Sequence, residues 1–283
     1  MNTTSIQQPN DSFTFRRWSL LVSLHWAENK RRFLLSLLAI AALITAFFAF
    51  EISFTPVDFD FGSQFSIYYI GLYIVGCLYG STVFSALSHR RKAIQYLTFP
   101  ASTPEKLFCS MFFGVILFFI AYVTVFYIVD IPMVALNNML LRRHNASPDS
   151  YTKVINVFSN LGGPIPNNEL RFLTVFFTIQ SAYILGGLYF PRFSFITTSI
   201  FLVFFTFLLW LFADRMVMAF LPATWDGNEF FYWHSFDPTG NYREIVELPS
   251  VMGNIIRFLL IYSWPFWLWL VIYYRLKEKE VRG

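Results

Sequence analysis

The side chains that could carry out chemistry in this chain are few and widely separated. The four histidines, His25, His89, His144 and His234, fall in four different segments, and Cys77 and Cys109 fall in two different apolar runs. A structural zinc site needs four converging nitrogen or sulfur ligands, and the H-E-x-x-H helix of metalloproteases does not occur. The densest acidic set is Asp226, Glu229 and Asp237 around His234, which offers an external metal site as an alternative to an ordinary acidic loop.

Nucleotide chemistry is also missing from the chain. No G-x-x-x-x-G-K-[ST] motif is present, nor any Gly-Lys pair, so no P-loop can form around a triphosphate. The G-x-S-x-G turn of serine hydrolases does not occur either. We therefore expect no catalytic residue, no metal and no cofactor in this chain.

The amino-acid composition indicates the solvent in which this chain resides. Its 283 residues are 56% hydrophobic and 13% charged, whereas soluble domains carry about 25% charged residues. A formal net charge of +4 gives no reason to expect nucleic-acid binding. The composition predicts an all-α polytopic membrane protein whose main solvent is lipid.

Apolar runs of membrane length predict six transmembrane helices in one transmembrane domain, 1–283. The predicted spans are 33–50, 65–87, 107–129, 172–190, 193–213 and 258–276. Before them, Trp18, Val22 and Trp26 recur at helical spacing among basic residues, which predicts an N-terminal helix lying in the interface. The alternative is a charged cytoplasmic tail that leads into the first span.

The segments between the spans have their own patterns. Asp130 and Pro132 are expected to end span three, and the external loop 131–171 is expected to carry a short helix at about 151–158. The acidic, aromatic loop 214–257 is expected to hold short re-entrant or interfacial helices between spans five and six. Pro265 is expected to kink span six.

The distribution of basic residues sets the orientation. Fourteen of the 21 Lys and Arg residues fall in the segments 1–32, 88–106 and 275–283 or at Arg192. Because basic residues near span ends favour the cytoplasmic side, both termini are expected inside. Asp226 and Asn145 are then expected outside, and Arg91 and Lys277 inside.

Span two contains a pair of glycines with a spacing typical of close helix contacts. Gly76 and Gly80 form a small-xxx-small pattern, which lets two helix backbones approach. The partner is either another span of the same chain or a second copy of the chain.

The loop 88–106 between spans two and three has the most specific local pattern. Arg90, Arg91 and Lys92 open a short helix over 90–97. After Pro100, Ser102-x-x-Glu105 forms a capping box before Lys106, which predicts a stiff start for span three. An ordinary helix start is the simpler alternative.

The predicted spans offer no route for an ion-coupled mechanism, so any energy that the chain uses would have to enter from outside the bilayer. The predicted spans contain no Asp, Glu, Lys or Arg away from their ends, and ion-coupled transporters use such residues as relays. The cytoplasmic loop is the expected point of entry.

The loop also carries a family resemblance. Its residues Phe99-Pro100-Ala101-Ser102-Thr103-Pro104-Glu105-Lys106 resemble the Leu-Pro-Ala-Ser-x-x-Glu-Lys pattern of many bacterial ABC type-2 transporter permeases, notably those of Bacteroidetes. The tail 276–281, Leu-Lys-Glu-Lys-Glu-Val, resembles the ending of the same proteins. Phe99 departs from the usual Leu, and the loop 131–171 is long for that family.

The resemblance implies an all-helical permease in the bacterial inner membrane that forms a homodimer or heterodimer of permease chains. It implies a separate ATP-binding cassette subunit, which holds the ATP and Mg, and export of a lipid, drug, peptide or polysaccharide. The coupling residues would be Arg90, Arg91, Lys92, Pro100, Ala101, Ser102, Glu105 and Lys106. A lipid-modifying membrane enzyme that uses the acidic external loop and a non-transporting membrane scaffold stay open as alternatives.

Overall fold

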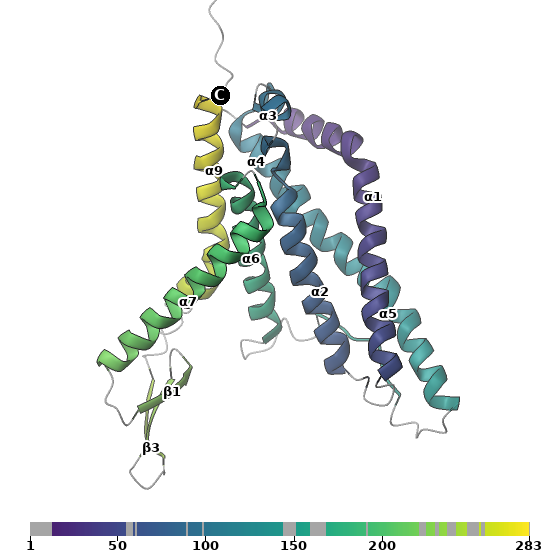
Figure 1. The fold of residues 1–283 in the computed structure, drawn as a ribbon, viewed down its shortest axis with the longest axis vertical. Helices are drawn as coiled ribbons and strands as arrows, with labels where there is room; N and C mark the ends of the chain where they lie inside the picture. Colours follow the sequence, from purple (N-terminus) through teal and green to yellow (C-terminus); the bar gives the residue numbers. More distant parts are fainter. Residues whose placement is uncertain are drawn as a thin grey trace, which may run out of the picture.

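The computed structural model is a splayed bundle of long helices (Figure 1). It describes residues 13–54, 59, 61–88, 90–97, 99–143, 151–158, 168–190, 192–220, 225–229, 232–236, 242–247, 255 and 258–282. The start of α1, the short helix α3 and the end of α9 lie together at one end, and α1 and α5 finish at the other.

The helices account for nearly all of the membrane-length apolar sequence. In chain order they are α1 (Phe15–Phe54), α2 (Phe61–Thr82), η1 (Ser85–Ser88), α3 (Arg90–Leu97), α4 (Thr103–Met111), η2 (Phe112–Leu117), α5 (Phe118–Arg143), α6 (Asn168–Tyr189), α7 (Ser194–Phe220), η4 (Phe258–Tyr262) and α9 (Trp264–Arg282). Among the described residues, five helices are long and apolar enough to cross a membrane: Phe15–Phe54, Gly62–Thr82, Thr103–Arg143, Leu170–Tyr189 and Ser194–Phe212. The chain is thus a helical membrane protein with five such helices.

The sixth predicted span, 258–276, is divided between η4 and α9 by a break at Ser263. Pro265 lies in the first turn of α9, where its missing N–H leaves no helical hydrogen bond unmade. The helical segment is thus interrupted at Ser263 and not at Pro265. A crossing by this segment remains a prediction.

α1 joins the predicted interfacial helix and the first span in one helix of 40 residues. Its first turns cross the top of the bundle in Figure 1, and the rest descends beside α5. Ile40, Ile44 and Phe48 recur every fourth residue and form its buried stripe. Near its start, Trp18 packs edge-on against Phe112 at a centroid distance of 5.9 Å, whereas Trp26 is exposed.

The prediction that span three ends at Asp130 and Pro132 is wrong. α4, η2 and α5 form one helix of 41 residues from Thr103 to Arg143, with Pro132 inside it on an exposed face. At about 1.5 Å per residue this helix is roughly 60 Å long, about twice the apolar thickness of a bilayer. Asp130 lies inside this helix, is fully buried and does not end it.

A single widened turn, η2, interrupts this long helix near its start. In a π turn the backbone carbonyls lose their usual partners, and such turns are stabilised when neighbours supply donors. Here Tyr79 Oη donates to the Phe113 carbonyl at 3.3 Å, and Gln180 Nε2 donates to the Gly114 carbonyl at 2.9 Å. The turn is thus held by side chains from both α2 and α6.

The core lies where α2, α5 and α6 meet. Tyr68, Tyr122, Phe126 and Phe176 are fully buried there, and Tyr122 Oη donates to the Tyr68 carbonyl at 2.8 Å. Large aromatic side chains of this kind pack edge to face and exclude small voids.

Gly76 and Gly80 lie in α2 where it packs most extensively on α6. A Cβ at Gly76 would overlap the Phe176 ring, and one at Gly80 would lie 3.2 Å from the Gln180 carbonyl oxygen. The helix that these glycines approach is therefore α6 of the same chain, and their face is covered within one copy.

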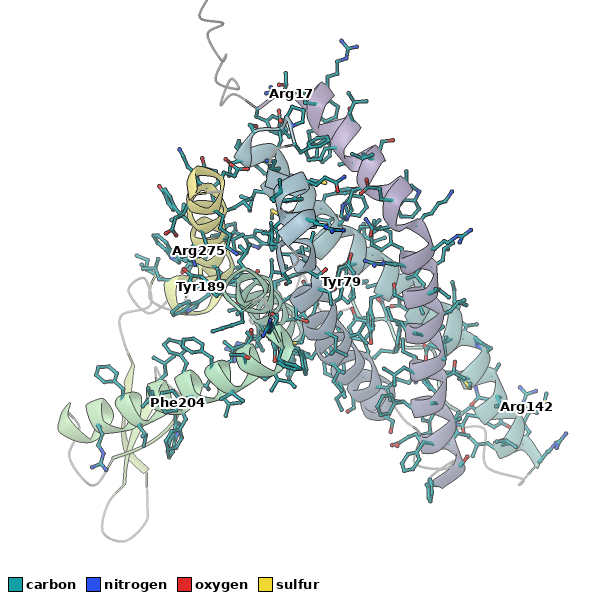
Figure 2. All side chains as sticks on the ribbon, turned by 45° about the horizontal axis from the view of Figure 1, so that its top comes forward. Arg17, Tyr79, Arg142, Tyr189, Phe204 and Arg275 are labelled. Atoms are coloured by element: carbon teal, nitrogen blue, oxygen red, sulfur yellow. The ribbon has the colours of Figure 1, made fainter. Side chains whose placement is uncertain are left out.

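α7 differs from its neighbour α6 in how little of it is packed. A tight turn joins the two helices, so the chain reverses direction between them. Thr198 of α7 packs against Gly186 of α6. Beyond that contact, α7 stands away from the bundle, and apolar side chains such as Phe204 project from it into the surroundings (Figure 2). In a membrane protein such a surface suits contact with lipid or another apolar helix.

Two segments that were predicted to hold short helices contain mostly other structure in their described residues, although Ile255 in the loop 214–257 is helical. Where re-entrant or interfacial helices were expected, α7 first continues to Phe220, and then β1 (Trp225–Glu229), β2 (Tyr232–Phe236) and β3 (Tyr242–Glu247) form an antiparallel sheet in the order β1-β2-β3. The segment 151–158, expected as a helix, is extended and ends in a turn. Side chains of neighbouring helices satisfy its backbone, so it needs no helical hydrogen bonds.

Candidate functional site

The candidate site is the corner where the chain enters its longest helix. α3 presents Arg91 and Gln95 to the surroundings, and the chain then turns through residues 99–106, which we name the elbow. The side chains of Arg90 and Lys92, predicted to contribute here, lie outside the described residues. Pro100 is exposed, whereas Ala101 and Ser102 are buried.

Glu105 caps the helix that begins at the elbow. Its Oε2 accepts a hydrogen bond from the Ser102 N–H at 2.9 Å, which is the glutamate half of the predicted capping box. The Ser102 hydroxyl, the other half of the box, lies in capping position but outside hydrogen-bonding geometry. Pro104 occupies the first turn, where it is tolerated. The carboxylate therefore does more of the capping than the serine.

The same carboxylate also holds the start of α1. Oε1 of Glu105 accepts from the Thr14 backbone N–H at 2.8 Å and from Arg17 Nε at 3.1 Å, and Arg17 Nη2 lies 3.1 Å away. Glu105 is fully buried. Hydrogen bonds to a charged group are the stronger kind, and this carboxylate takes two of them from a segment 88 or more residues away in the sequence.

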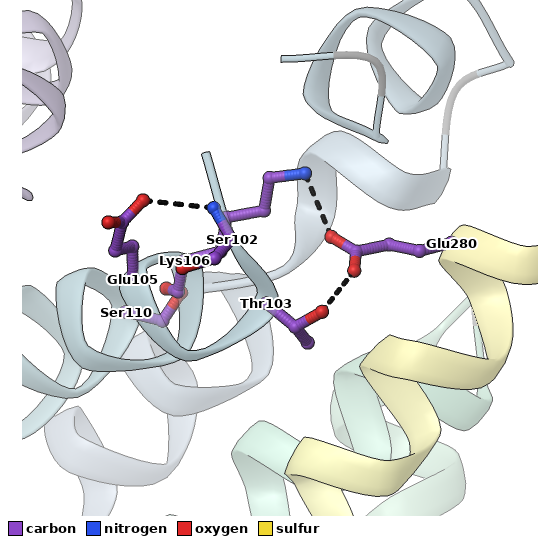
Figure 3. A network of polar contacts seen from close by, with 6 residues as sticks. All are labelled: Ser102, Thr103, Glu105, Lys106, Ser110 and Glu280. Atoms are coloured by element: carbon purple, nitrogen blue, oxygen red, sulfur yellow. Dashed lines mark hydrogen bonds and ion pairs between the residues drawn. The ribbon is translucent and has the colours of Figure 1, made fainter. Parts of the chain in front are cut away.

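Lys106, the next residue, holds the end of α9. Its Nζ lies 2.8 Å from Oε1 of Glu280, and Thr103 Oγ1 donates to Oε2 of the same carboxylate (Figure 3). The Lys106 side chain is 2% exposed and that of Glu280 20% exposed. The ammonium also lies 5.8 Å from the centre of the Tyr96 ring of α3, a cation–π distance.

Two adjacent residues of opposite charge thus connect the elbow to both terminal helices. Glu105 pairs with α1 and Lys106 with α9, and each pair is largely withdrawn from water. We name Arg17, Thr103, Glu105, Lys106 and Glu280 the clasp. Arg17 and Arg275 lie toward the same end of the molecule in Figure 2, opposite Arg142.

The tail of α9 is further fixed to the α6–α7 corner. Lys279 Nζ donates to the Leu188 carbonyl at 2.8 Å, and the Arg275 guanidinium lies 4.6 Å from the centre of the Tyr189 ring. Partial burial and the Arg275 charge lower the pKa of Lys279. The charged tail is thus packed against this corner.

Sequence reasoning missed three members of the clasp. Arg17 and Glu280 were assigned to an interfacial helix and a charged tail, and Thr103 only to a helix start. The available signal was the pair of opposite charges Glu105-Lys106 at a helix start, because adjacent buried charges require partners from elsewhere.

The other candidate site is the acidic set around His234. Asp226 pairs opposite His234 across β1 and β2, and Asp237 lies outside the described residues. Within the part of the chain that the structure describes, no three His, Cys, Asp or Glu side chains gather as metal ligands. Searches against protein-family models, curated proteins and solved structures find no match to this chain.

Proposed function

We propose that this chain is the membrane-spanning permease subunit of an ATP-binding cassette exporter, with both termini in the cytoplasm of a bacterial cell. The observation that carries the proposal is the clasp. It ties a short exposed helix, through the elbow, to the first, third and last long helices of the chain. Work done on α3 from outside the membrane would reach several helices at once.

The mechanics follow from stiffness. A helix transmits displacement along its length because each turn is hydrogen-bonded to the next. The long helix 103–143 begins at the elbow, and its first turn is fixed to α1 by Glu105 and to α9 by Lys106. A push on α3 would therefore tilt the long helix, α1 and α9 together and would not merely bend the loop.

The partner and cofactors follow from what the sequence lacks. Since the chain has no P-loop, ATP and Mg would be bound by a separate ATPase subunit, and this chain would not itself be an enzyme. Two permease chains would assemble with that ATPase and export a lipid, drug, peptide or polysaccharide. Asp130 weakens the argument from missing ionisable residues, so the proposal rests on the clasp.

Site-directed photo-crosslinking tests the proposal directly. A photoreactive amino acid replaces Gln95, exposed on α3, and the matched control replaces Asn156, exposed at the opposite end. After illumination of intact cells, Gln95 should capture a soluble subunit whose peptides include a Walker A motif, and Asn156 should not. Absence of such a subunit at Gln95 would contradict the proposal, and changed lipid composition on deletion would then favour the lipid-modifying enzyme.

A further inference from the structure

The segment Tyr151–Phe158, which we name the strap, has backbone groups that are hydrogen-bonded by side chains of neighbouring helices and not by another strand. Gln64 Nε2 donates to the Lys153 carbonyl at 2.9 Å, and Gln64 Oε1 accepts from the Ile155 N–H at 3.1 Å. Asn138 repeats this arrangement at Thr152, donating to its carbonyl and accepting from its N–H, both at 2.9 Å. Two side-chain amides thus replace the backbone ladder that a strand would normally use.

One face of the strap is buried although the strap belongs to a loop. Ile155 and Val157 are 3% and 1% exposed, and the Val157 N–H donates to Tyr127 Oη at 3.1 Å. Thr152 Oγ1 donates to the Phe59 carbonyl at 2.6 Å. The strap therefore packs as part of the core at the end of the bundle opposite the clasp.

Asp130 of α5 is buried beneath this strap without a counter-charge among the described residues. It is 0% exposed, and neither carboxylate oxygen has a well-formed hydrogen bond among the described residues. The Ile155 N–H is directed toward it, but Gln64 Oε1 accepts from the same N–H at 3.1 Å, so Asp130 has at most a shared donor. A buried ionised carboxylate without a counter-charge is strongly unfavourable, so the group must be neutralised.

Among the described residues around Asp130, no cation offsets its charge, which leaves a proton as the neutralising species there. On the described elements packed around Asp130, the charged side chains are Glu51 of α1, which accepts from Ser63 at 3.4 Å, and Lys153 of the strap, which is exposed. The phenols there are Tyr68 and Tyr69 of α2, Tyr127 of α5 and Tyr151 of the strap. A hard cation takes six or more oxygen ligands. Both amide oxygens nearest in the strap network, those of Gln64 and Asn138, already accept from strap N–H groups.

We propose that Asp130 is a proton-binding site that controls the strap. With the proton bound, the neutral acid packs beneath Ile155 and the strap stays closed. When the proton leaves, the carboxylate requires water, and the strap must move away to admit it. The proposal needs no ATPase partner, so it stands or falls separately from the proposed function.

The direction of the pH effect on strap opening follows from the number of protons that each state of the strap binds. The closed strap holds one more proton than the open strap, so raising the pH favours opening. The ratio of open to closed strap should rise by at most about tenfold per pH unit over the window in which the proton is lost.

The test measures strap opening in purified protein in detergent. Cys77 and Cys109 are replaced by Ala, and a single cysteine is placed at buried Val157 or, as the reference, at exposed Asn156. The rate of maleimide labelling at 157 divided by that at 156 removes the intrinsic pH dependence of thiols. It is measured from about pH 5 to about pH 8 with Asp130 and with Asp130→Asn.

The expected result is a ratio that rises with pH in the Asp130 protein and stays low and flat in Asp130→Asn. A ratio that is flat in both proteins, or that rises equally in both, would overturn the proposal. Hydrogen exchange of the 151–158 peptide in the protein with native cysteines and Val157 provides a second measurement. After correction for intrinsic exchange, faster opening at higher pH supports the proposal, and pH-independent opening refutes it.

Discussion

The two ends of the helix 103–143 carry buried carboxylates in opposite situations. At the elbow, Glu105 accepts from two backbone N–H groups and from Arg17, and the adjacent Lys106 pairs with Glu280. Further along, Asp130 is equally buried but has no counter-charge among the described residues, and the one N–H directed toward it, that of Ile155, is shared with Gln64. One helix thus contains a fixed charge site and an unbalanced one.

The difference indicates what each end can do. A buried charge with complete hydrogen bonding fixes geometry, because any movement leaves the partner uncompensated. A buried acid without a counter-charge can ionise only if its surroundings open to water, so its protonation is coupled to a structural change and responds to pH. We therefore assign rigid coupling to the clasp and switching to the strap.

The largest expected effect comes from removing the carboxylate that Lys106 requires. Glu280→Ala should lower the free energy of unfolding by about 3 kcal/mol, because a nearly buried ammonium is left without its counter-charge. Thermal unfolding followed by tryptophan fluorescence measures it.

Glu278→Ala is the matched control on the same helix. Its pair with Arg275 at 2.5 Å is more exposed and should contribute less than about 1 kcal/mol. Equal losses of stability in the two variants would show that the Lys106–Glu280 pair contributes no more than an exposed surface pair.

The same acid-to-amide change at the two ends should have different effects. Glu105→Gln should cost about 1.5–3 kcal/mol, because charge-assisted hydrogen bonds to Thr14, Arg17 and Ser102 are weakened. Asp130→Asn should cost little, since no such bond is lost there. Chemical unfolding at neutral pH compares them, and a larger loss for Asp130→Asn would reverse our assignment.

Gln64→Met should loosen the strap without opening the clasp. The change keeps the side-chain length but leaves the Ile155 N–H and the Lys153 carbonyl without a partner, which costs about 1–2 kcal/mol. Maleimide labelling at Val157→Cys should rise, whereas Gln95→Met on exposed α3 should leave it unchanged. Unchanged labelling in Gln64→Met would mean that these bonds do not hold the strap.

The smallest effect is expected at the serine of the capping box. Ser102→Ala should change the free energy of unfolding by less than the usual ~1 kcal/mol for an N-cap, because Glu105 keeps its hydrogen bond to the Ser102 N–H in this variant. A loss of a full N-cap value would place the capping in Ser102 and not in Glu105.

Local patterns in the sequence predicted the helices and the corner well. Apolar length identified most of the long helices, and the Ser102-x-x-Glu105 spacing predicted the helix start that the structure shows. These features depend on residues within a few positions of one another. The Gly76–Gly80 spacing likewise predicted a close helix contact, but the sequence left open which helix would fill it.

Features that depend on distant partners were missed. Lys106 and Glu280 are 174 positions apart, and no local pattern pairs them. The strap was expected to be helical because nothing nearby in sequence shows that Gln64 and Asn138 would satisfy its backbone. Asp130 and Pro132 normally end membrane helices, but burial by the strap and an exposed proline face allow α5 to continue.

ATP hydrolysis by the complex that we propose this chain forms with a cassette ATPase tests the central claim most directly. The ATPase that the proposal expects Gln95 to capture is co-purified with the native chain, with Glu105→Gln, and with Glu278→Gln as the control at the same end of the molecule. We predict that all three retain the ATPase subunit, while Glu105→Gln alone loses the stimulation of hydrolysis by the membrane subunit. Native rates in Glu105→Gln, with its weakened clasp verified by unfolding, would contradict the claim that the clasp couples the ATPase to the helices.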